Sequence, residues 1–315
     1  MLIRPATETA VFTASAGIFS DATLDALELC YRENGFVILR DVYRPELLER
    51  MQAECATAQR QVVAGDLPQR YGSTVFLDEG FRRERFRREG FLPAALRKDA
   101  YLEDPAKAEP FANYVEFINE LSPAVRAAIT SPSLVAALHR VLGVSAWLRD
   151  DQQFGVVYQD ARPGRESGYS RIGWHSDWQA GPSQTLWPST AFTIHLDATS
   201  PANGFLRVVP GSHNWATPAP YRNINNVAVP PTAQPAGGYT ATPPPFEMPL
   251  AFEAIPGEVP VIAEVGDVIL HDCYLWHSAA RATDDDTTRR HVRGAYYAGD
   301  RQSPLPDEFI KNAAR

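Results

Sequence analysis

The feature that most constrains the fold is a change of pattern near residue 145. Beyond it, the chain is a series of short β-rich runs separated by Gly, Pro and Asn. The runs are "FGVVYQ" (154–159), "RIGWHSDW" (171–178), "TAFTIHLD" (190–197), "GFLRVVP" (204–210), "MPLAFEAI" (248–255), "VPVIAEV" (259–265), "DVILHDC" (267–273), "LWHSAA" (275–280) and "RRHVRGAYY" (289–297). A series of about eight antiparallel strands predicts a jelly-roll barrel.

The first half of the chain has helical periodicity instead. The pattern predicts one helix over 21–34, with Asp21 as its N-cap and Gly35 just past its end. A short β-rich run, "FVILRDV", follows, then a second helix from "RPELLERM", and helical periodicity returns over 109–142. We therefore predict a single domain over 1–315, in which helices of the N-terminal part (about 1–144) pack on one face of a barrel formed by 145–300.

One segment inside the barrel region does not fit a core. Residues 217–247 are rich in Pro and Gly, and long loops of this kind are usually functional lids or lack fixed structure. We predict that this loop is mobile and that it becomes ordered over a bound substrate.

Composition narrows the class of partner and the kind of metal site. The chain has 30 basic and 38 acidic side chains and a net charge of −8, so no nucleic-acid partner is expected. No apolar run approaches the roughly 20 residues that a membrane span needs, so no membrane association is expected. Three cysteines without a CxxC motif suit a cytoplasmic protein, and any metal site must use His and carboxylates.

Two H-x-D motifs are candidate metal-binding pairs. In a strand, residues i and i+2 point to the same face, so His175 and Asp177 could reach one ion. The motif alone is weak, because His195 and Asp197 form a second match. About four strands fit between the first pair and a later histidine, His277, as a barrel requires. The second pair leaves one strand too few, so the first pair is favoured.

The third ligand has two nearby candidates. His271 and His277 lie six residues apart and would share a face of one straight strand. The sequence spacing from His277 to the arginines that open the last strand favours His277 as the third ligand. His271 is then expected to be a core residue or a residue that contacts the ligands without binding the metal. Two histidines and one carboxylate leave three positions of an octahedral ion open, as in non-haem Fe(II) oxygenases.

Taken together, these motifs resemble the phytanoyl-CoA dioxygenase family of Fe(II)/2-oxoglutarate oxygenases. The resemblance covers most of the chain. It rests on "ENGFVILRDVYRPELLERM", "WHSD" (174–177), "ANGFLRVVPGSH" (202–213), "VGDVILHD" (265–272) and "LWH" followed by "RR" (275–290). Parts of it are also similar to ectoine hydroxylases. However, "WHSD" continues here as "WQAG" instead of the aromatic and acidic residues of that branch, which argues against ectoine as the substrate.

The resemblance implies a double-stranded β-helix, a cupin-like jelly roll, that binds Fe(II) through His175, Asp177 and His277. It also implies 2-oxoglutarate as co-substrate, O2 as oxidant, and an arginine on the last strand that binds the distal carboxylate. Arg289 and Arg290 are adjacent, and alternation should point only one of them inward. Compared with the usual spacing in the family, this chain has one extra residue before the pair, which leaves the register of the strand open. Arg289 is favoured over Arg290.

The implied reaction is hydroxylation of an aliphatic C–H bond in a small organic molecule. Related halogenases carry a small residue where this chain has Asp177, so the carboxylate argues against halogenation. Desaturation, cyclisation or epimerisation by the same oxidant remains open. So does a barrel that binds metal without oxidation, as an isomerase or a sensor. Trp178 and Gln179 are the predicted substrate contacts, and an apolar surface with one amide suits a mid-sized molecule.

Overall fold

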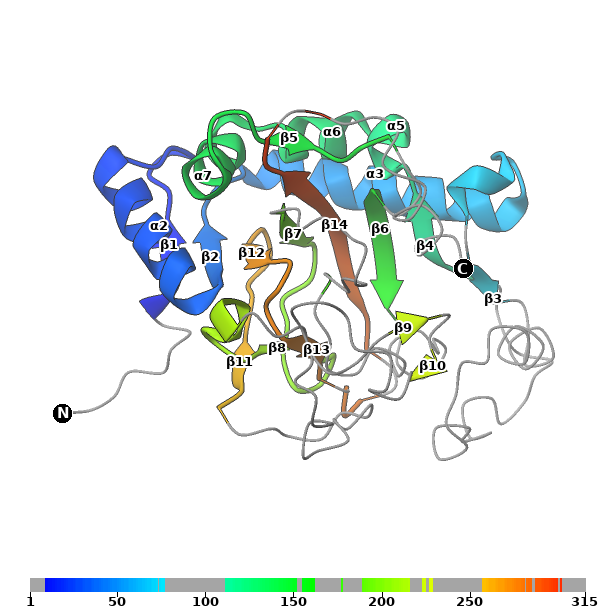
Figure 1. Cartoon of the computed structure of the whole chain (residues 1–315). Helices are drawn as coiled ribbons and strands as arrows, with labels where there is room; N and C mark the ends of the chain where they lie inside the picture. The colour runs from blue at the N-terminus through cyan, green and yellow to red at the C-terminus, as the bar shows by residue number, and fades with distance from the viewer. Residues whose placement is uncertain are drawn as a thin grey trace.

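The computed structural model of the chain is described for residues 9–72, 74–76, 111–151, 155–161, 177, 189–215, 223–224, 227–228, 257–280, 282–284, 287–299 and 301. Within these residues, a large sheet lies between a layer of helices and a second, smaller sheet (Figure 1). The mixed architecture of helices and sheets agrees with the predicted class, and the helices pack on one face of the large sheet as expected.

The large sheet is nine-stranded in the described part of the chain, with the order β1-β2-β12-β7-β14-β6-β4-β3, and β5 pairs with β14. All its ladders are antiparallel except that of β1 with β2. Its strands are β1 (Val11–Thr13), β2 (Phe36–Arg40), β3 (Thr74–Phe76), β4 (Phe111–Glu116), β5 (Trp147–Leu148), β6 (Val156–Ala161), β7 (Ser189–His195), β12 (Val268–Asp272) and β14 (Arg289–Tyr297).

The smaller sheet is three-stranded, with the antiparallel order β11-β8-β13. Its strands are β8 (Leu206–Val208), β11 (Val259–Val261) and β13 (His277–Ala279). A separate two-stranded ladder joins β9 (Asn223–Ile224) to β10 (Val227–Ala228), and the rest of the predicted loop 217–247 lies outside the described residues. Seven of the nine β-rich runs contain these strands, whereas 171–178 and 248–255 lie almost wholly outside the description.

The helices confirm most of the predicted boundaries. They are α2 (Asp21–Asn34), α3 (Pro45–Ala64), α5 (Ile118–Leu121), α6 (Pro123–Ile129) and α7 (Pro132–Leu142), with short 3-10 turns η1 (Gln69–Tyr71) and η6 (Ser212–Trp215). Gly35 ends α2 in the left-handed conformation (φ 80°), as glycine at this position commonly does. The predicted N-cap of α2 was wrong by one residue, because Ser20 accepts the hydrogen bond from Thr23 N and Asp21 is the first helical residue.

The predicted helix over 109–142 was wrong at its start. Phe111–Glu116 forms β4, which pairs with β3 on one side and β6 on the other. Aromatic and β-branched residues favour a strand, and the free edge of β6 supplies the pairing that local periodicity cannot reveal. Phe117, with a left-handed φ of 51°, then turns the chain into α5.

Two apolar cores lie on opposite faces of the large sheet. The helix-facing core joins α2, α3, α6 and α7 to side chains such as Phe192, Ile194 and Val292. The other core joins β2 and β12 to the smaller sheet through Ile38, Ile269 and other buried residues of that face. We call the space between the two sheets the interior. Since alternate residues of each strand face it, the sequence of β7, β12 and β14 determines its chemistry.

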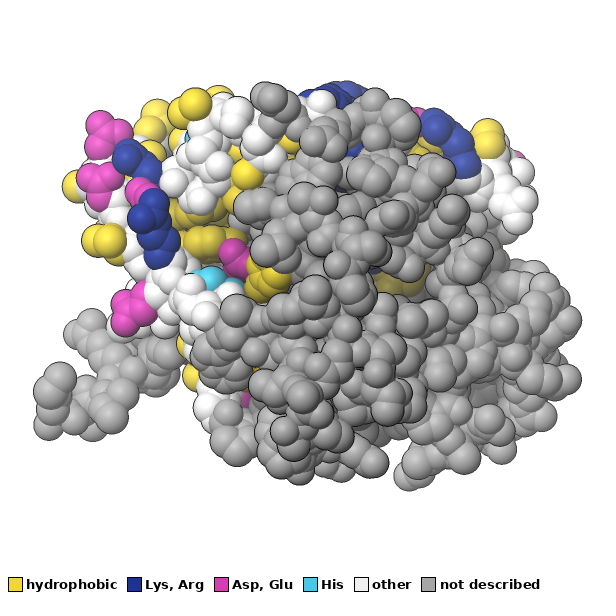
Figure 2. Space-filling model, in the orientation of Figure 1, with side chains coloured by type: hydrophobic (Ala, Val, Ile, Leu, Met, Phe, Trp, Pro, Cys, Tyr) yellow, Lys and Arg dark blue, Asp and Glu magenta, His cyan; other side chains and the backbone are white. Residues whose placement is uncertain are grey.

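Ion pairs connect neighbouring elements in both the large sheet and the helix layer. Arg40 of β2 binds Asp267, just before β12, through two hydrogen bonds of 3.0 and 2.8 Å. On the helix layer, Arg140 of α7 lies 3.0 Å from Asp25 of α2. Figure 2 shows acidic and basic side chains intermingled over the edge where α2 lies. No helix in the described part of the chain is long and apolar enough to cross a membrane.

Candidate metal centre

One cluster of metal-binding side chains lies in the interior. Asp177, His271 and His277 each offer a ligand atom, and these atoms all lie within 4.8 Å of one another. The Asp177 carboxylate places Oδ2 3.1 Å from Nε2 of His271 and Oδ1 3.6 Å from Nε2 of His277. Both imidazoles are buried, and the Asp177 side chain is 44% exposed. Among the residues that the structure describes, this is the one group of three or more such side chains.

The two histidines meet because the two sheets face each other. His271 is near the end of β12 in the large sheet, and His277 begins β13 in the smaller one. Their ring centroids are 4.6 Å apart, with an angle of 54° between the planes. The tight turn between β12 and β13 carries the chain from one sheet to the other, so residues six apart in sequence face each other across the interior.

Hydrogen bonds assign different roles to the two rings. Nδ1 of His277 lies 2.9 Å from the carbonyl oxygen of Leu275, which can only accept, so Nδ1 carries the hydrogen. In the neutral ring, Nε2 then presents a lone pair, which a metal ligand needs. Nε2 of His271 instead lies at hydrogen-bond distance from the Asp177 carboxylate, which is also an acceptor, so this nitrogen donates. His277 is therefore oriented as a ligand, and His271 as a donor to one.

The neighbouring thiol does not add a soft ligand. Cys273 is buried, and burial raises the pKa of its thiol well above the ordinary value; the negative charge of Asp272 adds to the effect. A neutral thiol is a poor metal ligand, since the thiolate is the binding form. The centre thus offers nitrogen and oxygen donors.

The predicted site residues fall into three groups. Asp177 and His277 are brought together, while His175, Trp178 and Gln179 lie outside the described residues. The rival pair does not assemble, because Asp197 binds Arg290 and His195 lies in a different cluster. His213 is not part of the cluster, and its Nε2 lies 3.1 Å from the Arg32 carbonyl oxygen near the end of α2.

Arg289 and Arg290 face opposite sides of β14. Arg290 is on the helix-facing side, where its guanidinium forms two hydrogen bonds to Asp197, from Nε at 2.8 Å and from Nη2 at 2.6 Å. This pair raises the pKa of Arg290. Arg289 is buried on the interior side, where its charge lowers the pKa values of His195 and His291. Only Arg289 therefore points into the interior.

Sequence reasoning missed a second pair of histidines. His195 of β7 and His291 of β14 are cross-strand partners, and their ring centroids lie 5.8 Å apart. Both are buried on the same face of the sheet as His271. The sequence held part of the information, because His291 is two residues from Arg289 and so shares its face of the strand. It could not identify His195 as the partner, because the pairing of β14 with β7 is known only from the structure.

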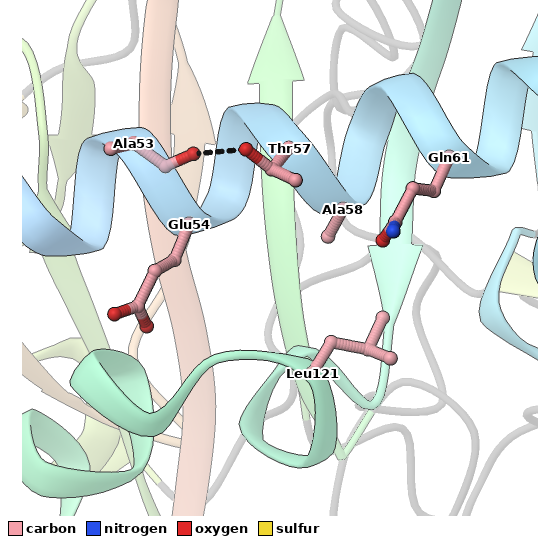
Figure 3. A pocket seen from close by; sticks show the side chains of 6 residues that line it. All are labelled: Ala53, Glu54, Thr57, Ala58, Gln61 and Leu121. Carbon is pink, nitrogen blue, oxygen red and sulfur yellow. Dashed lines mark hydrogen bonds between the residues drawn. The ribbon is translucent and has the colours of Figure 1, made fainter.

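A second feature that could bind a ligand is a pocket on the helix layer, but its charged side chain has a structural role. It has a volume of about 210 Å³ and lies between α3 and α5, lined by Glu54, Thr57, Leu121 and neighbouring side chains (Figure 3). Its charged group, the Glu54 carboxylate, accepts hydrogen bonds from Ser122 Oγ (2.6 Å) and Ala124 N (2.8 Å) at the start of α6. Glu54 therefore stabilises a helix N-terminus, and the pocket lies on the opposite face of the large sheet from the metal centre.

Two solved structures of low sequence identity have a similar fold. The chain matches SnoK, a non-heme alpha ketoglutarate dependent carbocyclase from nogalamycin biosynthesis, with a TM-score of 0.54 and 17% identity over 95% of this chain and 92% of that one. It matches EctD from S. alaskensis with bound Fe at a TM-score of 0.51 and 18% identity, over 94% and 83%. A match to EvdMO1 (TM-score 0.48, 21% identity) covers 88% of this chain but 50% of that chain.

The family assignment comes from the sequence. No curated protein sequence matches this chain. The model of the phytanoyl-CoA dioxygenase (PhyH) family matches residues 31–292, which include Asp177, both metal-centre histidines and the two arginines. This match confirms the resemblance that the motifs indicated, and the chain belongs to the phytanoyl-CoA dioxygenase (PhyH) family.

Proposed function

We propose that this protein is an Fe(II)- and 2-oxoglutarate-dependent oxygenase whose iron is held by His175, Asp177 and His277. The observation that carries the proposal is the approach of the Asp177 carboxylate to Nε2 of His277, on a ring whose other nitrogen is bonded to a backbone carbonyl. Family membership and the Fe and 2-oxoglutarate named for its structural neighbours support this assignment.

The order of the strands supports a double-stranded β-helix. β8 and β11 lie in the smaller sheet, β12 in the large one, β13 in the smaller one and β14 in the large one. Such crossing between two facing sheets is the arrangement of a jelly roll. The metal centre would then lie between the sheets, at the end of the barrel where β12 ends and β13 begins.

The donor set fits Fe(II). Two imidazoles and one carboxylate bind one face of an octahedral ion and leave positions for co-substrate and O2. In this assignment His271 is not a ligand: its Nε2–H binds Oδ2 of Asp177 and holds the carboxylate so that Oδ1 faces His277. Such outer hydrogen bonds orient metal ligands and tune their basicity.

Arg289 is the residue that we propose for the distal carboxylate of 2-oxoglutarate. It faces the interior, whereas Arg290 already binds Asp197 on the other side of the sheet. A guanidinium grips a carboxylate through two parallel charge-assisted hydrogen bonds. Bound Fe(II), 2-oxoglutarate and O2 would together supply the oxidant for a substrate C–H bond. The protein's contribution is to orient the substrate and exclude water.

The proposed reaction is hydroxylation of a small organic molecule, with Trp178 and Gln179 as substrate contacts. The carboxylate of Asp177 fills the position that a halide would need in a halogenase. Cyclisation is the second candidate, because SnoK is a carbocyclase and shares the fold. Which product forms depends on where the substrate C–H bonds lie relative to the oxidant.

The test is Fe(II)-dependent conversion of 2-oxoglutarate to succinate, measured by mass spectrometry with a panel of candidate substrates. We expect succinate to form only with Fe(II) and O2, together with products heavier by one oxygen, or lighter by two hydrogens for cyclisation. Asp177→Ala should lower turnover by more than about a thousandfold, while the exposed Asp66→Ala control should not. Turnover in Asp177→Ala equal to that of the control would refute the assignment of Asp177 as an iron ligand. Wild-type protein that forms no succinate with any substrate would instead favour a non-oxidative metal-binding barrel.

A further inference from the structure

The His195–His291 pair lies in the interior and is not part of the metal centre. The two residues are opposite each other on β7 and β14, with ring planes inclined by 36°. Relative exposure is 3% for His195 and 6% for His291, so both rings are withdrawn from solvent. On the same strand, β14, Arg289 lies two residues before His291 and faces the same side.

Three of the four ring nitrogens of this pair lack a hydrogen-bond partner among the described residues. Both Nδ1 and Nε2 of His195, and Nδ1 of His291, are buried without a partner among the described residues. Leaving a buried polar atom unsatisfied typically costs about 1–3 kcal/mol, and native proteins satisfy most such atoms. Three such atoms in one cluster therefore indicate that the described residues leave a place here for a further polar group.

The charge around the pair identifies that group. Burial and, to a smaller extent, the positive charge of Arg289 together lower the pKa of His195 to about 3. Burial, Arg289, His195 and Arg293 all lower the pKa of His291. Among the described residues, the charged side chains that act on these two rings, Arg289 and Arg293, are cationic, and the complementary ligand is an anion that accepts hydrogen bonds.

We propose that His195 and His291 form, together with Arg289, an anion subsite that binds the distal carboxylate of the 2-oxo acid through imidazole N–H donors. This inference rests on the proposed function and adds to it two residues that determine co-substrate specificity. His291 lies on the same strand as Arg289 and His195 on the neighbouring strand, so the three side chains would offer donors from two strands to one carboxylate. The subsite then favours a 2-oxo dicarboxylic acid over a 2-oxo monocarboxylic acid of the same length.

The test compares two oxo acids. 2-Oxopentanoate keeps the keto and C1-carboxylate groups of 2-oxoglutarate but lacks the distal carboxylate. Each is titrated calorimetrically, without O2, into the full-length protein loaded with Mn(II), which keeps activity out of the readout. Variants are His195→Phe and His291→Phe, which retain a ring without N–H, and the control is His139→Phe on α7.

We expect each Phe variant to raise the Kd for 2-oxoglutarate by about ten- to a hundredfold, since a hydrogen bond to a charged group is lost. The Kd for 2-oxopentanoate should change by less than about threefold. His291→Asn, which keeps a donor near the position of Nδ1, should recover part of the affinity. A purely structural role would weaken binding of both oxo acids equally and would not be rescued by Asn.

The outcomes separate this inference from the proposed function. Wild-type protein that binds 2-oxoglutarate with a Kd unchanged in both Phe variants would overturn the anion subsite alone. The same conclusion follows if the Phe variants raise the Kd values for both oxo acids by the same factor. Wild-type protein that binds Mn(II) but neither oxo acid would overturn both proposals.

Discussion

Two pairs of buried histidines face the same interior, and they differ in the charge beside them. His271 and His277 meet the Asp177 carboxylate, whereas His195 and His291 lie beside the Arg289 guanidinium. The ring centroids are 4.6 Å apart in the first pair and 5.8 Å apart in the second. In our proposals the same side chain serves two purposes, because the first pair would bind a cation and the second an anion.

The two pairs also differ in whether a backbone carbonyl group lies within hydrogen-bond distance of a ring nitrogen. In the first pair, a carbonyl oxygen fixes the hydrogen on Nδ1 of His277 and leaves Nε2 as a lone pair. In the second pair, no described backbone group engages the nitrogens of His195, so they are left for a ligand. A 2-oxo acid that chelates a metal at one end and carries a carboxylate at the other matches both pairs.

The largest expected effect separates the two arginines. Arg289→Ala should raise the Kd for 2-oxoglutarate by roughly a hundredfold, because a bidentate charge-assisted contact is lost, without changing metal affinity. Arg290→Ala should leave the Kd within about threefold and instead lower the free energy of unfolding by about 1–2 kcal/mol, since Asp197 loses its partner at a half-buried site. Titration calorimetry and urea unfolding measure the two quantities. Equal effects on binding would refute the assignment.

A smaller effect distinguishes the histidines of the first pair. His271→Phe should weaken Mn(II) binding by about ten- to a hundredfold, as expected when the hydrogen bond that orients a metal-binding carboxylate is removed. His271→Gln, which retains an N–H donor, should recover part of this loss. Complete loss of metal binding in both variants would instead make His271 a ligand, and the cluster Asp177, His271 and His277 the metal site.

The smallest effect concerns stability and pH. Because the folded-state pKa of His195 is about 3, the unfolded chain takes up a proton below its ordinary value near 6.5 and the folded protein does not. The free energy of unfolding should therefore fall as pH decreases from about 6.5 towards 3. His195→Phe should reduce that slope by about 1 kcal/mol per pH unit. Denaturant unfolding of ligand-free protein at several pH values measures it, and identical slopes would contradict the burial of a neutral ring.

Sequence patterns predicted the parts of the fold that depend on local periodicity. β6, β7, β8 and β11 to β14 lie in runs that β-rich composition and turn residues indicated, and the end of α2 follows from Gly35. β9 and β10 lie in the segment that was predicted as a loop. β4 was not predicted, because its conformation depends on pairing with β3 and β6, which are distant in sequence. Spacing led to a predicted metal site that includes Asp177 and His277, and Oδ1 of Asp177 lies 3.6 Å from Nε2 of His277. Which of Arg289 and Arg290 faces the interior depends on the register of β14. The sequence left this register open, because the chain has one more residue before the strand than is usual in the family.

The His195–His291 pair was invisible for a related reason. Each histidine looked isolated in the sequence, and His195 belonged to a motif that competed for the metal. Only the register between β7 and β14 places the two rings face to face, and only the second sheet encloses them. Contacts between strands carry this information, whereas spacing along one strand does not.

The most direct test of the division between cation and anion pairs is a Mn(II) titration followed by electron paramagnetic resonance. Wild-type protein should bind one Mn(II) per chain, His277→Ala and Asp177→Ala should lose that site, and the double variant His195→Phe/His291→Phe should keep it with unchanged affinity. Retained Mn(II) binding in His277→Ala, or its loss in the double variant, would contradict the account.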